Sequence, residues 1–293
     1  DEIAGRYAVA GRRLARLREA GAQVVCGVDA TQLHEGPLAS AELFDRILFN
    51  FPLLPVKAHK PRSGATDVQL ANRAMLAEFL RSAAYLLRPE GVVIIANKDC
   101  YPYSWWRLEA LPQWSGGKLA FIGALPWQYT EYPTLYSGPC NVNRDASVKP
   151  TDATMFLFAH ADCKRFRPAM EMAEIYGRQG EDPSRPLREP GPFRCLLCQI
   201  STLTDADLLV HKAGKIHRKR AGLEERWEAA CALATSSRTS VVDVATSLRS
   251  LRPQDDGGQR HDNKESPPST LRIQSSSTTC CWGPCLWALG IHR

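Results

Sequence analysis

The sequence predicts an α/β domain followed by a small metal-binding finger and a disordered tail. Three observations lead to this prediction. An apolar run over residues 44–51 ends in Asn50-Phe51-Pro52, as a buried parallel strand does where it meets a turn. A helical pattern over residues 68–87 precedes a second apolar run at 91–98, and strand, helix, strand is a parallel crossover. Two cysteines and two histidines near residue 200 have the spacing of zinc ligands.

Composition sets the limits of the interpretation. A chain of 293 residues, 44% hydrophobic and 23% charged, can bury one α/β core and still carry a second module. The net charge of +6 is modest, so the clustering of basic residues matters more than their number. Ten cysteines without a dense, even spacing favour a reducing compartment. No apolar run reaches the roughly 18 residues of a membrane span, so we expect no membrane partner.

The remaining elements of the first domain follow from periodicity. Gly21 is placed to end the first helix, and Pro89-Glu90-Gly91 to end the second. The apolar side of the second helix holds Leu70, Met75, Leu76, Phe79, Leu80, Ala83, Leu86 and Leu87. The other expected elements are a helix at 5–20, strands at 23–28, 119–125 and 153–160, a short helix to Leu111, and loops at 53–66 and 127–136.

Candidate binding residues lie where two predicted strands end. Open α/β sheets bind ligands at the carboxyl ends of their strands. There, Asn50 offers an amide, Phe51 an aromatic face and Pro52 a rigid turn, which suits a flat nucleobase, although an ordinary strand and proline turn would look the same. Asp29 can accept hydrogen bonds from a ligand amino group, or can simply cap a helix or turn.

Several of these segments, in their order and spacing, resemble the eukaryotic ribosomal RNA uridine-N3 methyltransferase-like domain. The resemblance covers about residues 1–160. It rests on Gly27-Val28-Asp29-Ala30-Thr31, Phe44-Asp45-Arg46-Ile47, Asn50-Phe51-Pro52, Lys98, Pro102-Tyr103, Trp106, Tyr132-Pro133 and Thr154-Met155-Phe156-Leu157-Phe158.

The resemblance implies a Rossmann-like methyltransferase that uses S-adenosylmethionine and forms N3-methyluridine in large-subunit ribosomal RNA. It places Asp29 at the adenine of the cofactor. It places Asn50, Phe51 and Pro52 beside the target base, and Lys98, Tyr103 and Trp106 on the RNA side of the pocket. The uridine N3 must lose its proton, which Asp99 could accept while Lys98 stabilises the anion, or the two could form a strand-end ion pair.

Two departures from the family pattern bear on activity. The first strand of the family and its Gly-Asp-Phe-Ser-Phe cofactor loop should lie upstream of residue 1, so the sheet lacks its first strands. Either the chain is a fragment of an active enzyme and is inactive alone, or it is a non-catalytic RNA-binding or ribosome-assembly factor that retains the fold. The second departure is Leu53, which stands where the family usually has a histidine.

The second module is a zinc-finger pattern. Cys195, Cys198, His211 and His217 form C-x2-C-x12-H-x5-H, which gives tetrahedral zinc two thiolates from a hairpin and two imidazoles from a helix. Four protein ligands leave no open position, so we expect a structural ββα-type site. The wider pattern resembles matrin-type and double-stranded-RNA-binding zinc fingers.

Basic residues lie on both sides of His217, the second histidine of the finger. Lys212, Lys215, Arg218, Lys219 and Arg220 lie between residues 211 and 220 without an acid, which favours contact with RNA phosphates. Recognition of duplex RNA by shape would give weak sequence preference. A solvated basic helix and a protein-docking finger are the alternatives.

These patterns divide the chain into four parts. Residues 1–162 are the methyltransferase-like domain, 163–191 a linker with a short helix at 169–176, 192–222 the finger, and 223–293 a short helix and a disordered tail. Cysteines near residue 280 are either a second metal cluster with His292 or an error of the gene model. We expect a nuclear protein, nucleolar if its RNA is ribosomal, with the cytoplasm as the alternative.

Overall fold

A four-stranded mixed sheet forms the centre of the first domain. The structure, a computed structural model, describes residues 10–54, 68–128, 139–141, 144–147, 152–171, 193–198 and 200–237. The strand order is β1-β2-β6-β3. These strands are β1 (Phe44–Asn50), β2 (Leu87–Lys98), β3 (Leu119–Pro126) and β6 (Ala153–His160).

Strand directions confirm the predicted crossover. β1 pairs with β2 in parallel, and the register ends with Asn50 opposite Ala96. β6 lies between β2 and β3 and is antiparallel to both. Apolar side chains alternate with partly exposed ones on β1, β2 and β6, and the fully buried ones include Ile47, Val93 and Phe158. The predicted α/β class is therefore confirmed as a mixed α/β fold.

The first helix, α2 (Ala10–Glu19), ends as predicted, but the strand expected after it is wrong. Gly21 has φ of 81°, which closes the helix in the left-handed conformation. Residues 22–26 belong to no strand and pair with no described strand. A β-strand is defined by its hydrogen bonds to a neighbouring strand. An apolar run with strand-like residues does not show whether such a neighbour exists. Val25 and Val28 nevertheless pack against the main core.

The boundary between α4 (Val68–Ala83) and β2 also differs from the prediction. The helix stops at Ala83, and Leu87 already belongs to β2, which continues through Pro89 to Lys98. Between Phe44 and Arg46 the register with β2 jumps from Leu87 to Val92. Four residues of β2 therefore oppose Asp45 as a bulge, which is how a proline fits within a strand.

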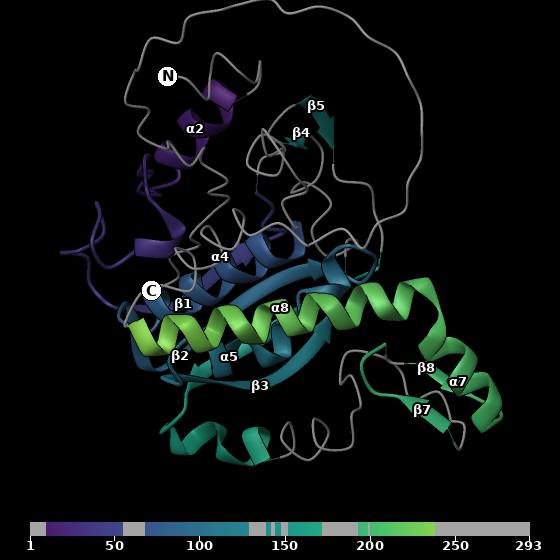
Figure 1. Cartoon of the computed structure of the whole chain (residues 1–293). Coiled ribbons are helices and arrows are strands. Elements are labelled where there is room, and N and C mark those ends of the chain that lie inside the picture. The colour runs from purple at the N-terminus through teal and green to yellow at the C-terminus, as the bar shows by residue number, and fades with distance from the viewer. Residues whose placement is uncertain are drawn as a thin grey trace, which may run out of the picture.

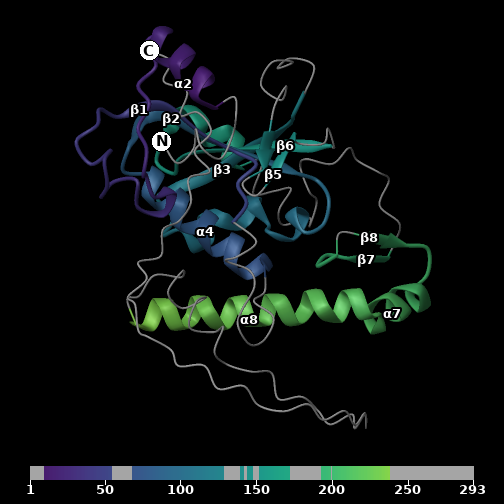
Figure 2. The same ribbon diagram turned by 90° about the horizontal axis from the view of Figure 1, so that it is seen from above.

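Both faces of α4 are covered. Its predicted apolar residues are all buried, mostly against the sheet. Leu70 and Ala74 instead face a second core, which α8 (Lys215–Ser237) completes with Leu223, Trp227, Ala230 and Ala234. These four residues recur at helical spacing and form one apolar stripe. In Figure 2 the sheet, α4 and α8 follow one another as three layers.

Short elements complete the described part of the chain. They are η1 (Ala30–Gln32), η2 (Tyr103–Trp105), η3 (Leu108–Ala110), α5 (Leu111–Trp114), η5 (Lys164–Phe166), β4 (Pro139–Asn141), β5 (Arg144–Ser147), β7 (Phe193–Cys195), β8 (Ile200–Thr202) and α7 (Asp205–Ala213). Figure 1 shows β7, β8 and α7 at one end of α8, beyond the edge of the sheet.

Some predicted segments lie outside the described residues. They are most of the 53–66 and 127–136 loops, the later part of the 169–176 helix, much of the linker, and the tail beyond residue 237. Residues 167–171 are helical, which places a helix slightly before the predicted start. Among the described helices, none has the length and apolar character to cross a membrane.

Candidate metal centre and sheet-edge site

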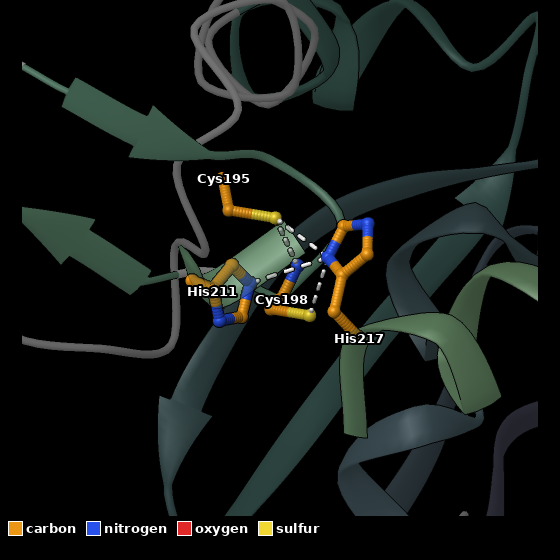
Figure 3. A group of neighbouring side chains, drawn as sticks. All are labelled: Cys195, Cys198, His211 and His217. Carbon is orange, nitrogen blue, oxygen red and sulfur yellow. Dashed lines mark hydrogen bonds between the residues drawn. The ribbon is translucent and has the colours of Figure 1, made fainter. Parts of the chain in front are cut away.

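The finger brings all four predicted metal ligands together. β7 and β8 form an antiparallel hairpin that carries Cys195 and Cys198, and α7 packs against it through buried Leu208. Thr204 caps α7 by accepting a hydrogen bond from the backbone N–H of Asp207, 3.1 Å away. Figure 3 shows the two thiols and two imidazoles converging on one point.

A break in the helix directs both histidines to that point. His211 lies on α7 and His217 on α8, and Gly214 separates the two helices with an extended ψ of 150°. A Cβ at Gly214 would lie 2.9 Å from the carbonyl oxygen of His211, closer than side chains approach. The glycine therefore allows the turn that brings the second imidazole back over the hairpin.

The distances between ligand atoms fit a tetrahedral zinc ion. With Zn–S of about 2.3 Å and Zn–N of about 2.0–2.1 Å, tetrahedral geometry places S and N ligands about 3.6 Å apart and two N ligands about 3.3 Å apart. His217 Nδ1 lies 3.4 Å from Cys195 Sγ, 3.5 Å from Cys198 Sγ and 3.2 Å from His211 Nε2. All four ligand atoms lie within 4.8 Å of one another.

Burial and the neighbouring ligands shift the pKa values of two side chains in the cluster. Burial, together with the adjacent Cys195, raises the pKa of the Cys198 thiol to about 11. Burial, and then the neighbouring His211, lower the pKa of His217, which favours the neutral imidazole. Neutral imidazoles and thiols that ionise on binding are the ligand forms zinc takes. The donor set therefore fits a closed, structural zinc site.

The basic residues of the finger divide into two groups. Lys212, Lys215, Arg218 and Lys219 are exposed. Arg220 is 8% exposed, and its guanidinium lies 5.6 Å from the centre of the Trp105 ring. Burial lowers the pKa of Arg220. Its position is that of a side chain that packs α8 onto the first domain.

At the sheet edge, Asn50 and Phe51 are held in an unusual arrangement. The Oδ1 atom of Asn50 is buried and has no hydrogen-bond partner among the described residues. Phe51 follows with φ of 51°, which costs a bulky residue about 1–3 kcal/mol and is concentrated at functional sites. The Phe51 N–H donates to the carbonyl of Ala96, 2.8 Å away, which fixes the turn to β2.

Trp127 completes an aromatic wall at this edge. Its ring meets the Phe51 ring edge-to-face, with centroids 5.3 Å apart. The backbone N–H of Trp127 donates a hydrogen bond to the carbonyl of Ala153, 2.8 Å away. This bond fixes the backbone that carries the indole to the start of β6. The sequence placed Trp127 only at the start of a loop, and its distance in sequence from Phe51 hid the contact.

The residues predicted on the RNA side separate in the structure. Lys98 ends β2 half-exposed, and its ammonium lies 6.0 Å from the centre of the Tyr103 ring. Burial, then the nearby Cys100, raises the pKa of Tyr103. Trp106 is fully buried in the main core and meets Tyr103 edge-to-face. It can support Tyr103 but offers no free face to a ligand.

The two carboxylates singled out from the sequence both have partners. Asp29 caps η1: its Oδ1 accepts hydrogen bonds from the N–H of Thr31 at 2.8 Å and from the Thr31 hydroxyl at 2.7 Å. The Oδ2 of Asp99 accepts from the hydroxyl of Thr154 at 3.1 Å. Asp29 thus has the capping role that was one of the two alternatives, and Asp99 is held at the end of β2.

The contact between α8 and the first domain is the feature that sequence reasoning missed. Arg73, fully buried on α4, donates to both carboxylate oxygens of Glu224, at 2.9 and 2.8 Å. Arg107 donates to the same carboxylate at 2.9 Å. The Arg73 guanidinium packs on the rings of both Trp114 and Trp227, 5.1 and 5.2 Å from their centres. An arginine within an apolar helix was the available signal.

Comparison with known proteins supports the resemblance of the first domain. Residues 1–137 match the family model described as "BMT5-like: rRNA (uridine-N3-)-methyltransferase BTM5-like". The chain is 33% identical over 179 residues to heavy metal-associated isoprenylated plant protein 41 of Arabidopsis thaliana, covering 61% of this chain and 32% of that protein.

Two further relatives cover smaller parts of this chain. The mouse (Mus musculus) ferredoxin-fold anticodon-binding domain-containing protein 1 homolog is 42% identical over 85 residues, 29% of this chain and 12% of its own length. An uncharacterised Arabidopsis thaliana protein is 26% identical over 133 residues, 45% of this chain and 62% of its own length. The chain thus spans between about an eighth and three fifths of these relatives.

Proposed function

We propose that this chain is the RNA-binding and target-base part of an S-adenosylmethionine-dependent methyltransferase that forms N3-methyluridine in large-subunit ribosomal RNA. Its finger is a structural zinc module that adds affinity for partly double-stranded RNA. A nucleolar location follows, because ribosomal RNA is made there. The observation that carries the proposal is the buried Oδ1 of Asn50, which has no hydrogen-bond partner in the described part of the chain, beside the left-handed Phe51 and inside the segment that matches the family.

The side chains at the sheet edge can form hydrogen bonds that complement those of uracil. The N3 of uracil is a donor between two carbonyl acceptors, and the Asn50 amide has both an acceptor and donors. Phe51 provides a partly exposed aromatic ring beside it, and the buried ring of Trp127 packs against Phe51. Lys98 can stabilise the anion that forms when N3 loses its proton, and the fixed carboxylate of Asp99 is the candidate acceptor of that proton.

The cofactor, when bound, supplies a methyl group on a sulfonium sulfur. Among the described residues, only Asp29 matches a residue that the family places at the cofactor, and one of its oxygens already binds Thr31. The residues present therefore fit the adenine end of the cofactor alone. The protein's contribution at this edge is alignment of the base, on which methyl transfer depends.

A non-catalytic RNA-binding or ribosome-assembly factor is the second candidate. The capping role of Asp29 favours it, because that carboxylate already has a structural function. The finger would serve either function, since its cluster is complete within the chain. Cofactor binding therefore distinguishes the two candidates.

The test combines cofactor binding with nucleoside analysis. The natural full-length protein is titrated calorimetrically with S-adenosylmethionine, and RNA treated with protein and cofactor is digested and searched for N3-methyluridine. Asn50→Ala should lower methylation by about 100-fold, since misplacement of reacting groups costs that much, and leave cofactor affinity unchanged. Asn50→Gln, which keeps the amide, should lose less.

The opposite results are equally clear. If the protein binds RNA but does not bind the cofactor, the non-catalytic assembly factor is the correct candidate. If Asn50→Ala methylates as well as the unaltered protein, or loses cofactor and RNA methylation together, Asn50 does not hold the target base.

A further inference from the structure

We propose that the sheet edge and the finger form one continuous binding surface, which holds a single RNA with its target base in a single-stranded segment and its adjoining stem on the finger. This inference rests on the proposed function and names its substrate class. The connecting surface consists of Lys98, Tyr103, Tyr101 and Lys219, called here the aromatic bridge, and the buried ring of Trp105 packs against Tyr101.

The bridge leads from the end of β2 to α8 through residues 101–105. At the sheet edge the ammonium of Lys98 lies 6.0 Å from the Tyr103 ring centre. Tyr103 and Trp105 form η2, next to Tyr101, whose ring meets that of Trp105 edge-to-face at 5.0 Å. At the far end, Lys219 Nζ lies 3.3 Å from the Tyr101 hydroxyl.

The chemistry of the bridge fits single-stranded RNA. Tyr101 is 55% exposed, and Lys98 and Lys219 also reach solvent. Aromatic faces on which bases stack, with cations at the phosphates, are the usual way to bind single strands without strong sequence preference. Lys212, Lys215 and Arg218 continue the positive charge onto the finger, where the stem would lie.

A rigid connection makes the two sites one surface. α8 begins beside the metal cluster at Lys215 and is clamped to the first domain by Glu224 and Trp227. One helix therefore carries a zinc ligand, the bridge lysine and the clamp. Binding at one site then raises the local concentration of RNA at the other, which strengthens binding without any new contact.

The test measures affinity and salt dependence of the full chain for two RNAs. One is a hairpin whose stem continues into a uridine-containing single strand, and the other is the stem alone. The unaltered protein should bind the first more tightly. Tyr101→Ala should weaken that binding about 5–10-fold and leave the stem unaffected, because one stacked base is lost. Tyr101→Phe keeps the ring and should retain most of the affinity.

Two further variants examine the cations and the clamp. Lys219→Ala should lower the salt slope for the longer RNA by about 0.7–0.9, as loss of one phosphate contact does. Arg226→Ala, on the same helix but outside the bridge, is the matched control. Trp227→Ala should release α8 and cost the longer RNA about tenfold or more, with stem binding retained.

The outcomes separate this inference from the proposed function. If the unaltered chain binds neither RNA, both fail, and a protein partner for the finger gains support. If it binds both RNAs equally, and Tyr101→Ala changes neither affinity, the continuous surface is refuted while RNA binding by the finger stands. Should Trp227→Ala not fold, the Tyr101 and Lys219 variants still decide the question, since both side chains lie at the surface.

Discussion

The two halves of α8 are held in place by different forces. Its first turns belong to a finger whose described buried core is little more than Cys195 and Leu208, with four metal-ligand atoms between hairpin and helix. Its later turns bury a full apolar stripe and an ion-pair network against α4 and α5. With zinc bound as proposed, one helix would depend on a metal at one end and on packing at the other.

The ion-pair network at the packed end of α8 stabilises the fold only while each buried charge keeps its partner. Burial alone would raise the pKa of Glu224, but hydrogen bonds and charges from Arg73 and Arg107 outweigh it and hold that pKa below its usual value. A buried arginine left without its carboxylate would be costly, so removal of one partner is far more harmful than the net contribution of the pair suggests.

Metal removal should have the largest effect, and only on the finger. Metal binding contributes about 10–16 kcal/mol to fingers of this size, so chelation should unfold residues 193–217. Hydrogen exchange should show rapid exchange there and continued protection of residues 223–234. Cys195→Ser should reproduce the loss, whereas Cys26→Ser, at an exposed cysteine outside the cluster, should not. Equal loss of protection along α8 would contradict the division.

Trp227→Ala should have the opposite pattern of effects: it should destabilise the first domain and leave the metal cluster intact. The indole is fully buried and contacts both Trp114 and the Arg73 guanidinium. Truncation of a buried aromatic costs about 3–5 kcal/mol. Thermal unfolding of the first domain should shift down, while the protein keeps one equivalent of zinc. Loss of zinc together with domain stability would show that the two ends are not independent.

Acid should weaken the packed end through Glu224. Because its folded pKa is lowered, its stabilisation is present above the unfolded pKa of about 4.3 and is lost as pH falls through the folded value. Glu224→Gln should remove about 3 kcal/mol at neutral pH and flatten the stability profile below pH 4. An unchanged acid profile in this variant would exclude Glu224 as the titrating group.

The smallest expected effect is the difference between alanine substitutions at two glycines, Gly214 and Gly222. Gly214→Ala places a methyl group 2.9 Å from the carbonyl of His211 and should weaken zinc affinity about tenfold, as changes next to ligands do. Gly222→Ala has open space and should instead stabilise α8 by about 0.5–1 kcal/mol. Competition with a chromophoric chelator measures the zinc affinity and thermal unfolding measures the stability, and equal zinc affinities of the two variants would show that the turn tolerates a Cβ.

Features encoded by neighbouring residues could be predicted from the sequence. The metal ligands follow from spacing within 23 residues, and β1, α4 and β6 from periodicity. The clamp could not be predicted in this way, because Arg73 and Glu224 are 151 positions apart. The strand expected at 23–28 failed for a related reason: residues 22–26 have suitable side chains, but a strand also needs a neighbour, which periodicity does not reveal.

The sheet edge lies between these cases. The end of β1 at Asn50 and the turn at Pro52 could be predicted from the run that precedes them. The left-handed conformation of Phe51 and its contact with Trp127 could not, because they arise from tertiary packing. The predicted lining role of Trp106 and the phosphate role of Arg220 rested on residue type, which does not report burial.

The most direct measurement is the yield of N3-methyluridine in the longer RNA of the binding experiment, using the natural full-length protein and S-adenosylmethionine. We expect N3-methyluridine to form in the single-stranded segment. We also expect chelation of the finger metal to lower the yield at limiting RNA without changing cofactor affinity. No methylated uridine, or a yield that is the same with and without the metal, would contradict the proposed function.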